Sequence, residues 1–119
     1  MSTSTNKIVN KRAKDPIDQL IFEKGLRIKD VLAVKKQDSL IVFLNTGIPL
    51  SIPLSFFPRL KKASQLQLNA WKLISKGVGI EWPEIDEDIS LKGLIQKLIT
   101  LNTLRFVAGV AGENFAMAA

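Results

Sequence analysis

Apolar and polar residues follow several different spacings along the chain, and each spacing predicts a particular element. Over residues 16–23 apolar side chains recur three and four positions apart, which is typical of a short helix. Asp15 is a suitable N-cap, because it precedes a proline at the first helical position. Three strands follow, which we expect at residues 27–34, 39–44 and 48–52. Their connections are too short for parallel strands, so they should form an antiparallel meander.

Two of these strands carry further signals. Every residue from Leu40 to Leu44 is apolar, which favours a strand that is covered on both faces. Pro49 and Pro53 limit the last strand to the edge of the sheet, because proline has no N–H to donate to a neighbouring strand. An exposed edge can pair with a strand of another chain, so this strand is a candidate docking site.

The second half of the chain has the pattern of two helices and a connecting segment. Ser64 and Gln67 have the spacing of a capping box, and the helix that they begin should end at Gly77. In the connection, residues 78–87, we expect Ile80, Trp82 and Ile85 to point inward between polar neighbours.

A last helix should start at Asp88 or Ser90, because leucine and isoleucine recur at helical spacing from Leu91 to Ile99 and, at the furthest, to Leu104. Together these elements predict a small single domain of the α+β class, with a three-stranded antiparallel meander packed against two or three helices. The expected boundaries are a flexible basic arm at residues 1–15, the domain at 16–101 and a C-terminal tail at 102–119.

Composition narrows the chemistry that the chain can perform. Among its 119 residues there is no cysteine and no histidine. This excludes thiolate nucleophiles, disulfides, Cys/His metal centres and triads with a histidine base. The remaining carboxylates, lysines and hydroxyls show no catalytic spacing, so we expect neither an enzyme nor a bound cofactor. No run of 18 apolar residues is present, and a cytoplasmic protein without a membrane span is expected.

Charge is distributed unevenly, with a net charge of +6, a basic middle at residues 24–76 and an acidic stretch at 77–93. The basic middle contains a stripe that could contact a partner, formed by Arg59, Lys61, Lys62, Lys72 and Lys76. Such a stripe can bind phosphates, although the chain has no recognition-helix pattern and no glycine-rich phosphate loop. The alternative is that these charges only keep a small protein in solution.

The acidic stretch contains the densest group of functional side chains, including Asp86, Glu87 and Asp88. Paired carboxylates can hold a divalent cation or serve acid–base catalysis. A structural role is favoured, because carboxylates that precede a helix accept backbone N–H groups and oppose the positive end of the dipole. Trp82, followed by Pro83, could anchor a partner, but the pattern favours a core residue that fixes an irregular segment.

Residues 48–94 resemble the bacterial domain-of-unknown-function family DUF2442. The similarity is carried by Phe57-Pro58-Arg59-Leu60, Trp82-Pro83 and Ile85-Asp86-Glu87-Asp88-Ile89-Ser90, and it extends over about residues 26–95. The resemblance implies a small α+β domain whose members often lie beside a small partner gene, as in toxin–antitoxin pairs. The last nine residues, AGENFAMAA, resemble the degradation tag that bacterial trans-translation adds to stalled products.

The resemblance and the lack of a catalytic constellation predict a protein-interaction module, which in its antitoxin-like form binds a protein partner without catalysis. The predicted contact surfaces are the edge strand of the meander and the basic stripe. The alternative is a nucleic-acid-binding accessory protein that uses the arm and the lysines of the stripe.

Overall fold

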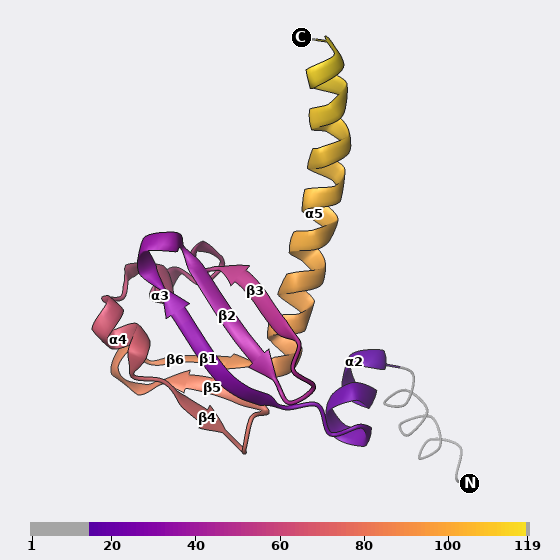
Figure 1. Ribbon diagram of the computed structural model, residues 1–119. Helices are drawn as coiled ribbons and strands as arrows, with labels where there is room; N and C mark the ends of the chain where they lie inside the picture. The colour runs from indigo at the N-terminus through magenta and orange to yellow at the C-terminus, as the bar shows by residue number, and fades with distance from the viewer. Residues whose placement is uncertain (1–14, 119) are drawn as a thin grey trace, which may run out of the picture.

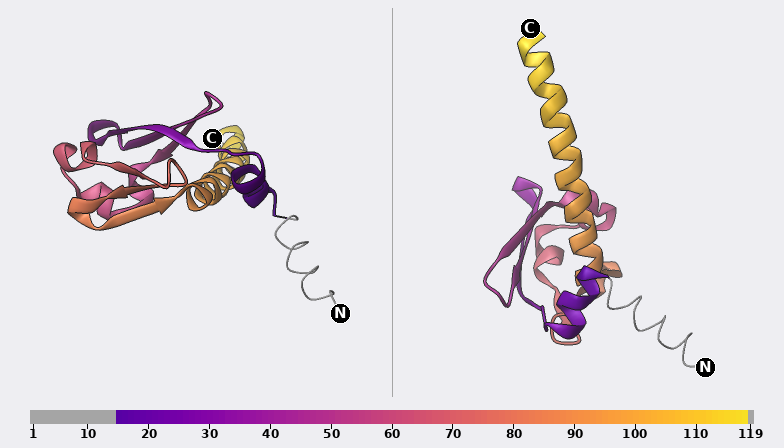
Figure 2. Two further views of the ribbon diagram at one scale, coloured as in Figure 1. Left: turned by 90° about the horizontal axis from the view of Figure 1, so that it is seen from below. Right: turned by 90° about the vertical axis from the view of Figure 1, so that its right-hand side faces the viewer.

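Two three-stranded antiparallel sheets enclose a common core, and a long C-terminal helix leaves this body at one side (Figure 1). The computed structural model describes residues 15–118. The first sheet has the order β1-β2-β3, with β1 at Ile28–Val34, β2 at Ser39–Leu44 and β3 at Pro49–Pro53. The second has the order β4-β5-β6, with β4 at Lys72–Ile74, β5 at Gly79–Trp82 and β6 at Glu87–Ser90. The two sheets form two layers when the molecule is viewed from below (Figure 2).

The first sheet is the predicted meander, with strand bounds within one residue of the expected ones. β3 lies at the edge, as its prolines require. The expectation that β2 is covered on both faces was wrong. Its buried residues alternate with half-buried ones, because only one face of the sheet meets the core.

The second sheet was not predicted, and it replaces most of an expected helix. The capping box is present: the Ser64 hydroxyl accepts the N–H of Gln67, and the Gln67 side chain accepts the N–H of Ser64. However, the helix that it begins, α4, covers only Gln65–Asn69, and β4 follows after two residues. The residues of the expected helix, from Ser64 to Gly77, are therefore divided between a short helix and a strand.

Gly77 does not end a helix but makes the turn between β4 and β5, with a φ of +113°. Its carbonyl accepts the N–H of Ile28 at 2.8 Å, which joins this turn to the start of β1. A Cβ at Gly77 would lie 2.2 Å from the carbonyl oxygen of Ile28. The glycine is thus required by a close approach between the two sheets.

The expected connecting segment contains β5, a 3-10 turn at Pro83–Ile85 (η4) and β6. The prediction that Ile80 and Trp82 point inward is confirmed, because both are fully buried, and Ile85 packs against the core while partly buried. The Trp82 indole N–H donates to the carbonyl of Leu68 at 3.0 Å, so its one polar atom is satisfied inside the core. Trp82 therefore joins the second sheet to α4.

Short helical segments close the ends of the two sheets. They are α2 at Pro16–Asp18, a π-helical turn at Gln19–Glu23 (η1), 3-10 turns at Lys35–Gln37 (η2) and Leu54–Phe56 (η3), and α3 at Pro58–Lys62. The N-cap predicted for the first helix is confirmed, because the Asp15 carboxylate accepts the N–H groups of Ile17 and Asp18 at 3.0 and 3.3 Å. The arm predicted at residues 1–15 lies almost entirely outside the described residues.

The last helix, α5, spans Leu91–Ala118. Ser90 is its N-cap, since the Ser90 hydroxyl accepts the N–H of Gly93 at 2.9 Å, whereas Asp88, the other expected start, lies in β6. The sequence predicts a tail from residue 102, but the backbone continues as a helix to Ala118. Several alanines and the absence of proline after Leu101 favour this continuation.

Candidate partner-binding surfaces

The cations of the predicted basic stripe do not form one surface. Arg59, Lys61 and Lys62 belong to α3, which lies beside η2, the turn that follows β1, as the hydrogen bond from the Lys35 ammonium to the carbonyl of Lys61 shows. Lys72 and Lys76 belong to β4 and to the turn after it, and that turn bonds to the first residue of β1. A seven-residue strand, about 23 Å long, therefore separates the two groups.

Two of these cations already have acidic partners. The Arg59 guanidinium donates to the backbone carbonyl of Asp86, and its distance to the Asp86 carboxylate is 3.7 Å. The Lys61 ammonium lies 2.9 Å from the Asp38 carboxylate. These pairs join α3 to the two turns that contain Asp38 and Asp86, both of which have a left-handed backbone. Arg59 and Lys61 thus support the fold at this end of the body.

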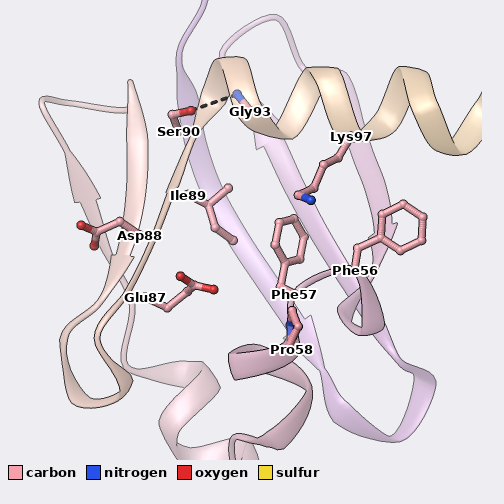
Figure 3. A pocket seen from close by; sticks show the side chains of 9 residues that line it. All are labelled: Phe56, Phe57, Pro58, Glu87, Asp88, Ile89, Ser90, Gly93 and Lys97. Atoms are coloured by element: carbon pink, nitrogen blue, oxygen red, sulfur yellow. Dashed lines mark hydrogen bonds between the residues drawn. The ribbon is translucent and has the colours of Figure 1, made fainter.

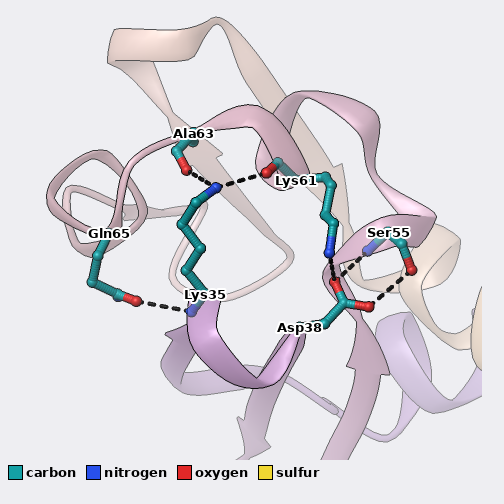
Figure 4. A network of polar contacts seen from close by, with 6 residues as sticks. All are labelled: Lys35, Asp38, Ser55, Lys61, Ala63 and Gln65. Atoms are coloured by element: carbon teal, nitrogen blue, oxygen red, sulfur yellow. Dashed lines mark hydrogen bonds and ion pairs between the residues drawn. The ribbon is translucent and has the colours of Figure 1, made fainter.

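Asp38 is the centre of a network that the sequence analysis missed (Figure 4). Its carboxylate accepts the Lys61 ammonium and both the N–H and the hydroxyl of Ser55, the last two at 3.1 Å. The hydrogen bond from Lys61 is the main reason why the pKa of Asp38 lies below its ordinary value. The network fixes the β1–β2 turn against η3 and α3.

The free edge of β1 is partly closed by a side chain. The Gln65 amide donates to the carbonyl of Ala33 at 2.7 Å and accepts the N–H of Lys35 at 2.8 Å, so it occupies the place of a neighbouring strand. The N–H of Val31 is bound by the carboxylate of Asp30 at 2.8 Å. These contacts leave little of this edge for a partner strand.

The edge of β3, which the sequence makes a candidate docking site, has few donors. The N–H of Leu44 donates to the carbonyl of Ile48, so the alternate residues Pro49, Ser51 and Pro53 direct their backbone groups away from β2. Only Ser51 of these three has an N–H. A strand added here would therefore gain few hydrogen bonds.

The acidic residues near the Trp82-Pro83 pair do not precede a helix. Asp86 follows η4, and Glu87 and Asp88 are in β6, so the expectation that these carboxylates cap the last helix was wrong. The reason is that four strand residues, ending at Ser90, lie between the turn and α5. Within residues 15–118, no three carboxylates converge on a position that could hold a metal ion.

A small cleft of about 340 Å³ lies between η3, β6 and the first turns of α5 (Figure 3). Its chemically active side chains are engaged or far apart. The Ser90 hydroxyl caps Gly93, and the Lys97 ammonium lies 5.5 Å from the centroid of the Phe57 ring, which is a cation–π contact. Glu87 lines the same cleft, but no ion pair joins it to Lys97 within the described residues.

A second, apolar groove runs beside α5 and has a volume of about 350 Å³. Its walls come from η1, the β2–β3 hairpin and α5, and its lining residues are Leu20, Leu26, Leu44, Thr46, Ile48, Leu50, Ile95, Leu98, Ile99 and Asn102. Leu20, Ile48 and Ile99 are 45%, 57% and 53% exposed. Large apolar side chains that gather around one exposed groove are typical of a binding site.

One wall of this groove is held in place by an ion-pair cluster. The Lys92 ammonium, on the first turn of α5, lies 3.0 Å from the carboxylates of both Asp15 and Asp18. Its hydrogen bond lowers the pKa of Asp15, and the two carboxylates, that of Asp18 first, raise the pKa of Lys92. The cluster fixes α2 and the following π-helical turn against α5, and with them Leu20.

The groove was not predicted from the sequence, although a signal was present. Leu91, Leu94 and Leu101 of α5 are buried in the core, whereas Ile95 and Ile99 lie on an adjacent face. A helix with a second apolar face beyond its core face has more apolar surface than a single contact requires. Only the fold shows that η1 and the β2–β3 hairpin lie beside this second face.

The fold defines a small α+β domain with two three-stranded sheets and one long helix, and comparisons place it in a family. The profile of the family described as "Protein of unknown function (DUF2442)" matches residues 28–100. The chain therefore belongs to the DUF2442 family, as its Trp-Pro and Asp-Glu-Asp motifs indicate. No curated protein matches the sequence.

Two solved structures are similar to this chain. A protein of unknown function from Rhodospirillum rubrum is 29% identical, with a TM-score of 0.54 over 60% of this chain and 87% of that one. An uncharacterized protein from Chromobacterium violaceum, solved by NMR, is 20% identical, with a TM-score of 0.56 over 72% of this chain and 78% of that one. The second likeness is a likeness of fold alone.

Proposed function

We propose that this protein is a non-catalytic protein-interaction module that binds an apolar α-helix in the groove beside α5. The observation that carries the proposal is the exposure of Leu20, Ile48 and Ile99 around that groove. Grooves of this kind bind the apolar face of a helix through side chains spaced three or four residues apart. The cluster at Lys92 supports this role, because it holds one wall in position before any partner arrives.

The antitoxin-like role belongs to this proposal as its more specific form. It rests on the resemblance of the family to two-protein systems, in which one small protein binds another. A cytoplasmic location is part of the same proposal. Among residues 15–118, no helix has the length and apolar character needed to cross a membrane.

The proposal is tested by comparing the proteins that co-purify with the intact chain and with a groove variant. An affinity-tagged chain is expressed in its native cells, beside the untagged native copy, and co-purified proteins are quantified by mass spectrometry. We expect one protein in stoichiometric amount, which can be the untagged copy. Ile99→Glu should reduce it at least tenfold, because a charge would be buried in an apolar groove.

Leu66→Glu is the matched control. Leu66 is 80% exposed on α4, on the far side of the body from α5 (Figure 1), so the same substitution there should leave the partner bound. The proposal fails if the intact chain retains no stoichiometric protein, or if Ile99→Glu retains as much as Leu66→Glu does.

Nucleic-acid binding is the alternative function, and one observation favours it. Within the described residues, Lys62, Lys72 and Lys76 have no acidic partner within 4 Å, unlike Arg59 and Lys61. If these lysines bind phosphates, the affinity for a DNA duplex should fall steeply as the salt concentration rises, because binding releases counterions from the DNA. Affinity that is unchanged between low and moderate salt excludes this alternative.

A further inference from the structure

The apolar lining of the groove continues along α5 beyond the body of the protein. Ile95, Ile99 and Asn102 line the groove. At 100° per residue, Phe106 and Gly109 fall within about 40° of the line through Ile95 along the helix axis. The stripe of Ile95, Ile99, Asn102, Phe106 and Gly109, called the α5 stripe below, thus has one half in the groove and one half outside it.

The outer half of the stripe has no cover. Residues 102–109 are all exposed, and the ring of Phe106 is 72% exposed. Figure 2 shows in its right view that this part of α5 stands clear of both sheets. Most of the stability of a helix in a protein comes from packing of its apolar face rather than from helix propensity. The outer half of α5 would therefore be stabilised by a surface against which it can pack.

The α5 stripe is self-complementary about Asn102. If a second α5 lies antiparallel to the first, with the two Asn102 residues side by side, Ile99 of each copy faces Phe106 of the other. Ile95 then faces Gly109, which has no side chain and borders open space in the single chain. The inner half of the stripe in each copy thus packs against the outer half of the stripe in the other copy. This is the isologous contact of a twofold dimer.

The exposed side chains are sufficient for such a contact. Leu20 and Ile48 form the outer walls of the groove, so they would enclose the phenyl ring of Phe106 from the second copy. Burial of Leu20, Ile48, Ile99 and Phe106 would remove on the order of 500 Å² of surface per copy, and the pair would reach the roughly 1,000 Å² that a specific interface requires. On both sides of the Asn102 pair this interface is apolar, as in stable homodimers.

We infer that the occupant of the groove is α5 of a second copy of this chain, bound antiparallel in a twofold dimer with Asn102 at the axis. This inference rests on the proposed function, since it names the helix that the groove binds. Two experiments test it, one on the mass of the particle and one on the register of the helices.

The first experiment measures the mass of the full chain by light scattering after size-exclusion chromatography. We expect twice the 13.2 kDa of one chain for the intact protein and for the control Leu66→Glu. Phe106→Glu should give the mass of one chain, because it places a charge between the two groove walls. Phe106 is exposed, so circular dichroism of this variant should still show a folded protein.

The second experiment uses the absence of cysteine from the chain. Asn102→Cys should form a disulfide-linked dimer on mild oxidation, because the two copies of residue 102 meet at the axis. Thr100→Cys is the matched control: Thr100 is also exposed, but it lies about 140° around the helix from Ile95 and should remain unlinked.

A monomeric intact chain overturns the inference, and so does equal cross-linking at residues 100 and 102. If the chain is monomeric but Ile99→Glu still loses a different protein in the co-purification, the proposed function stands and only the identity of the helix is wrong. If the chain is monomeric and the co-purification is insensitive to Ile99→Glu, both fail.

Discussion

At the scale of single residues, backbone conformation decides several positions that side-chain pattern alone misassigns. Asp38, Ser75, Lys76 and Asp86 all have positive φ, and each lies in a tight turn between strands. Asp86 shows the consequence: its left-handed backbone reverses the chain into β6, so its carboxylate cannot cap a helix. From residue type alone, Asp86 is only a carboxylate that precedes an apolar run, and such a residue is expected to cap a helix.

Gly77 gives the sharpest prediction at this scale. Gly77→Ala should lower the free energy of unfolding by about 3 kcal/mol or more, because it combines a left-handed φ with a collision against the Ile28 carbonyl. Urea unfolding of both proteins measures the difference.

The control for Gly77 is Gly47→Ala. Gly47 also has positive φ, +88°, but a Cβ there would meet nothing within 4 Å. We expect it to cost only about 1 kcal/mol, which is the strain of the backbone alone. Equal losses for the two variants would mean that the two sheets do not approach each other at Gly77.

At the scale of elements, short helices and turns are held by side chains from distant parts of the chain. η2 is attached to α3 and η3 through Asp38, and β1 is bordered by the Gln65 amide of α4. α2 is attached to α5 through Lys92. Elements of three to five residues cannot be stable alone, so these contacts are needed for them to form.

The Asp38 network predicts a dependence of stability on pH. Because the pKa of Asp38 is lowered in the folded protein, its contribution is present above its ordinary pKa of 3.8 and is lost as pH falls through the lower folded value. The free energy of unfolding of the intact chain, measured in urea, should therefore decrease as pH falls below about 4. In Asp38→Asn this part of the decrease should be missing, since asparagine tolerates the left-handed backbone and does not titrate there.

Asp15 provides the comparison for that experiment. Its pKa is also lowered, mainly by the hydrogen bond from Lys92, so the intact chain and Asp38→Asn share its contribution. Plots of the free energy of unfolding against pH should differ in slope between the two proteins only below about pH 4. Identical slopes there would show that Asp38 is not paired with Lys61 in solution.

At the scale of the whole molecule, the two sheets share one core, and the long helix adds a surface that the core does not use. The buried side chains of the first sheet, the second sheet and the start of α5 belong to one cluster. Leu91, Leu94 and Leu101 complete it, whereas residues 102–109 of α5 are exposed and lie outside the core. These exposed residues, 102–109, and the groove beside α5 are the basis of the proposed association.

A feature of the fold was predictable from the sequence when it depended on residues close together in the chain. The meander, the caps at Asp15 and Ser64 and the burial of Trp82 were predictable, because each depends on neighbouring residues or on a strong apolar preference. The second sheet was not predictable in this way. Residues 70–76 fit a helical spacing as well as a strand, and only pairing with β5 distinguishes the two.

The sequence by itself determined the α+β class, the family, the first sheet and the lack of histidine and cysteine chemistry. Local propensity, alternation and composition are sufficient for each of these. Only the tertiary structure decided that the basic stripe is divided, that the acidic residues lie in a turn and a strand, and that an apolar groove borders α5. These features depend on which distant segments pack together, and that choice is made by burial of the common core.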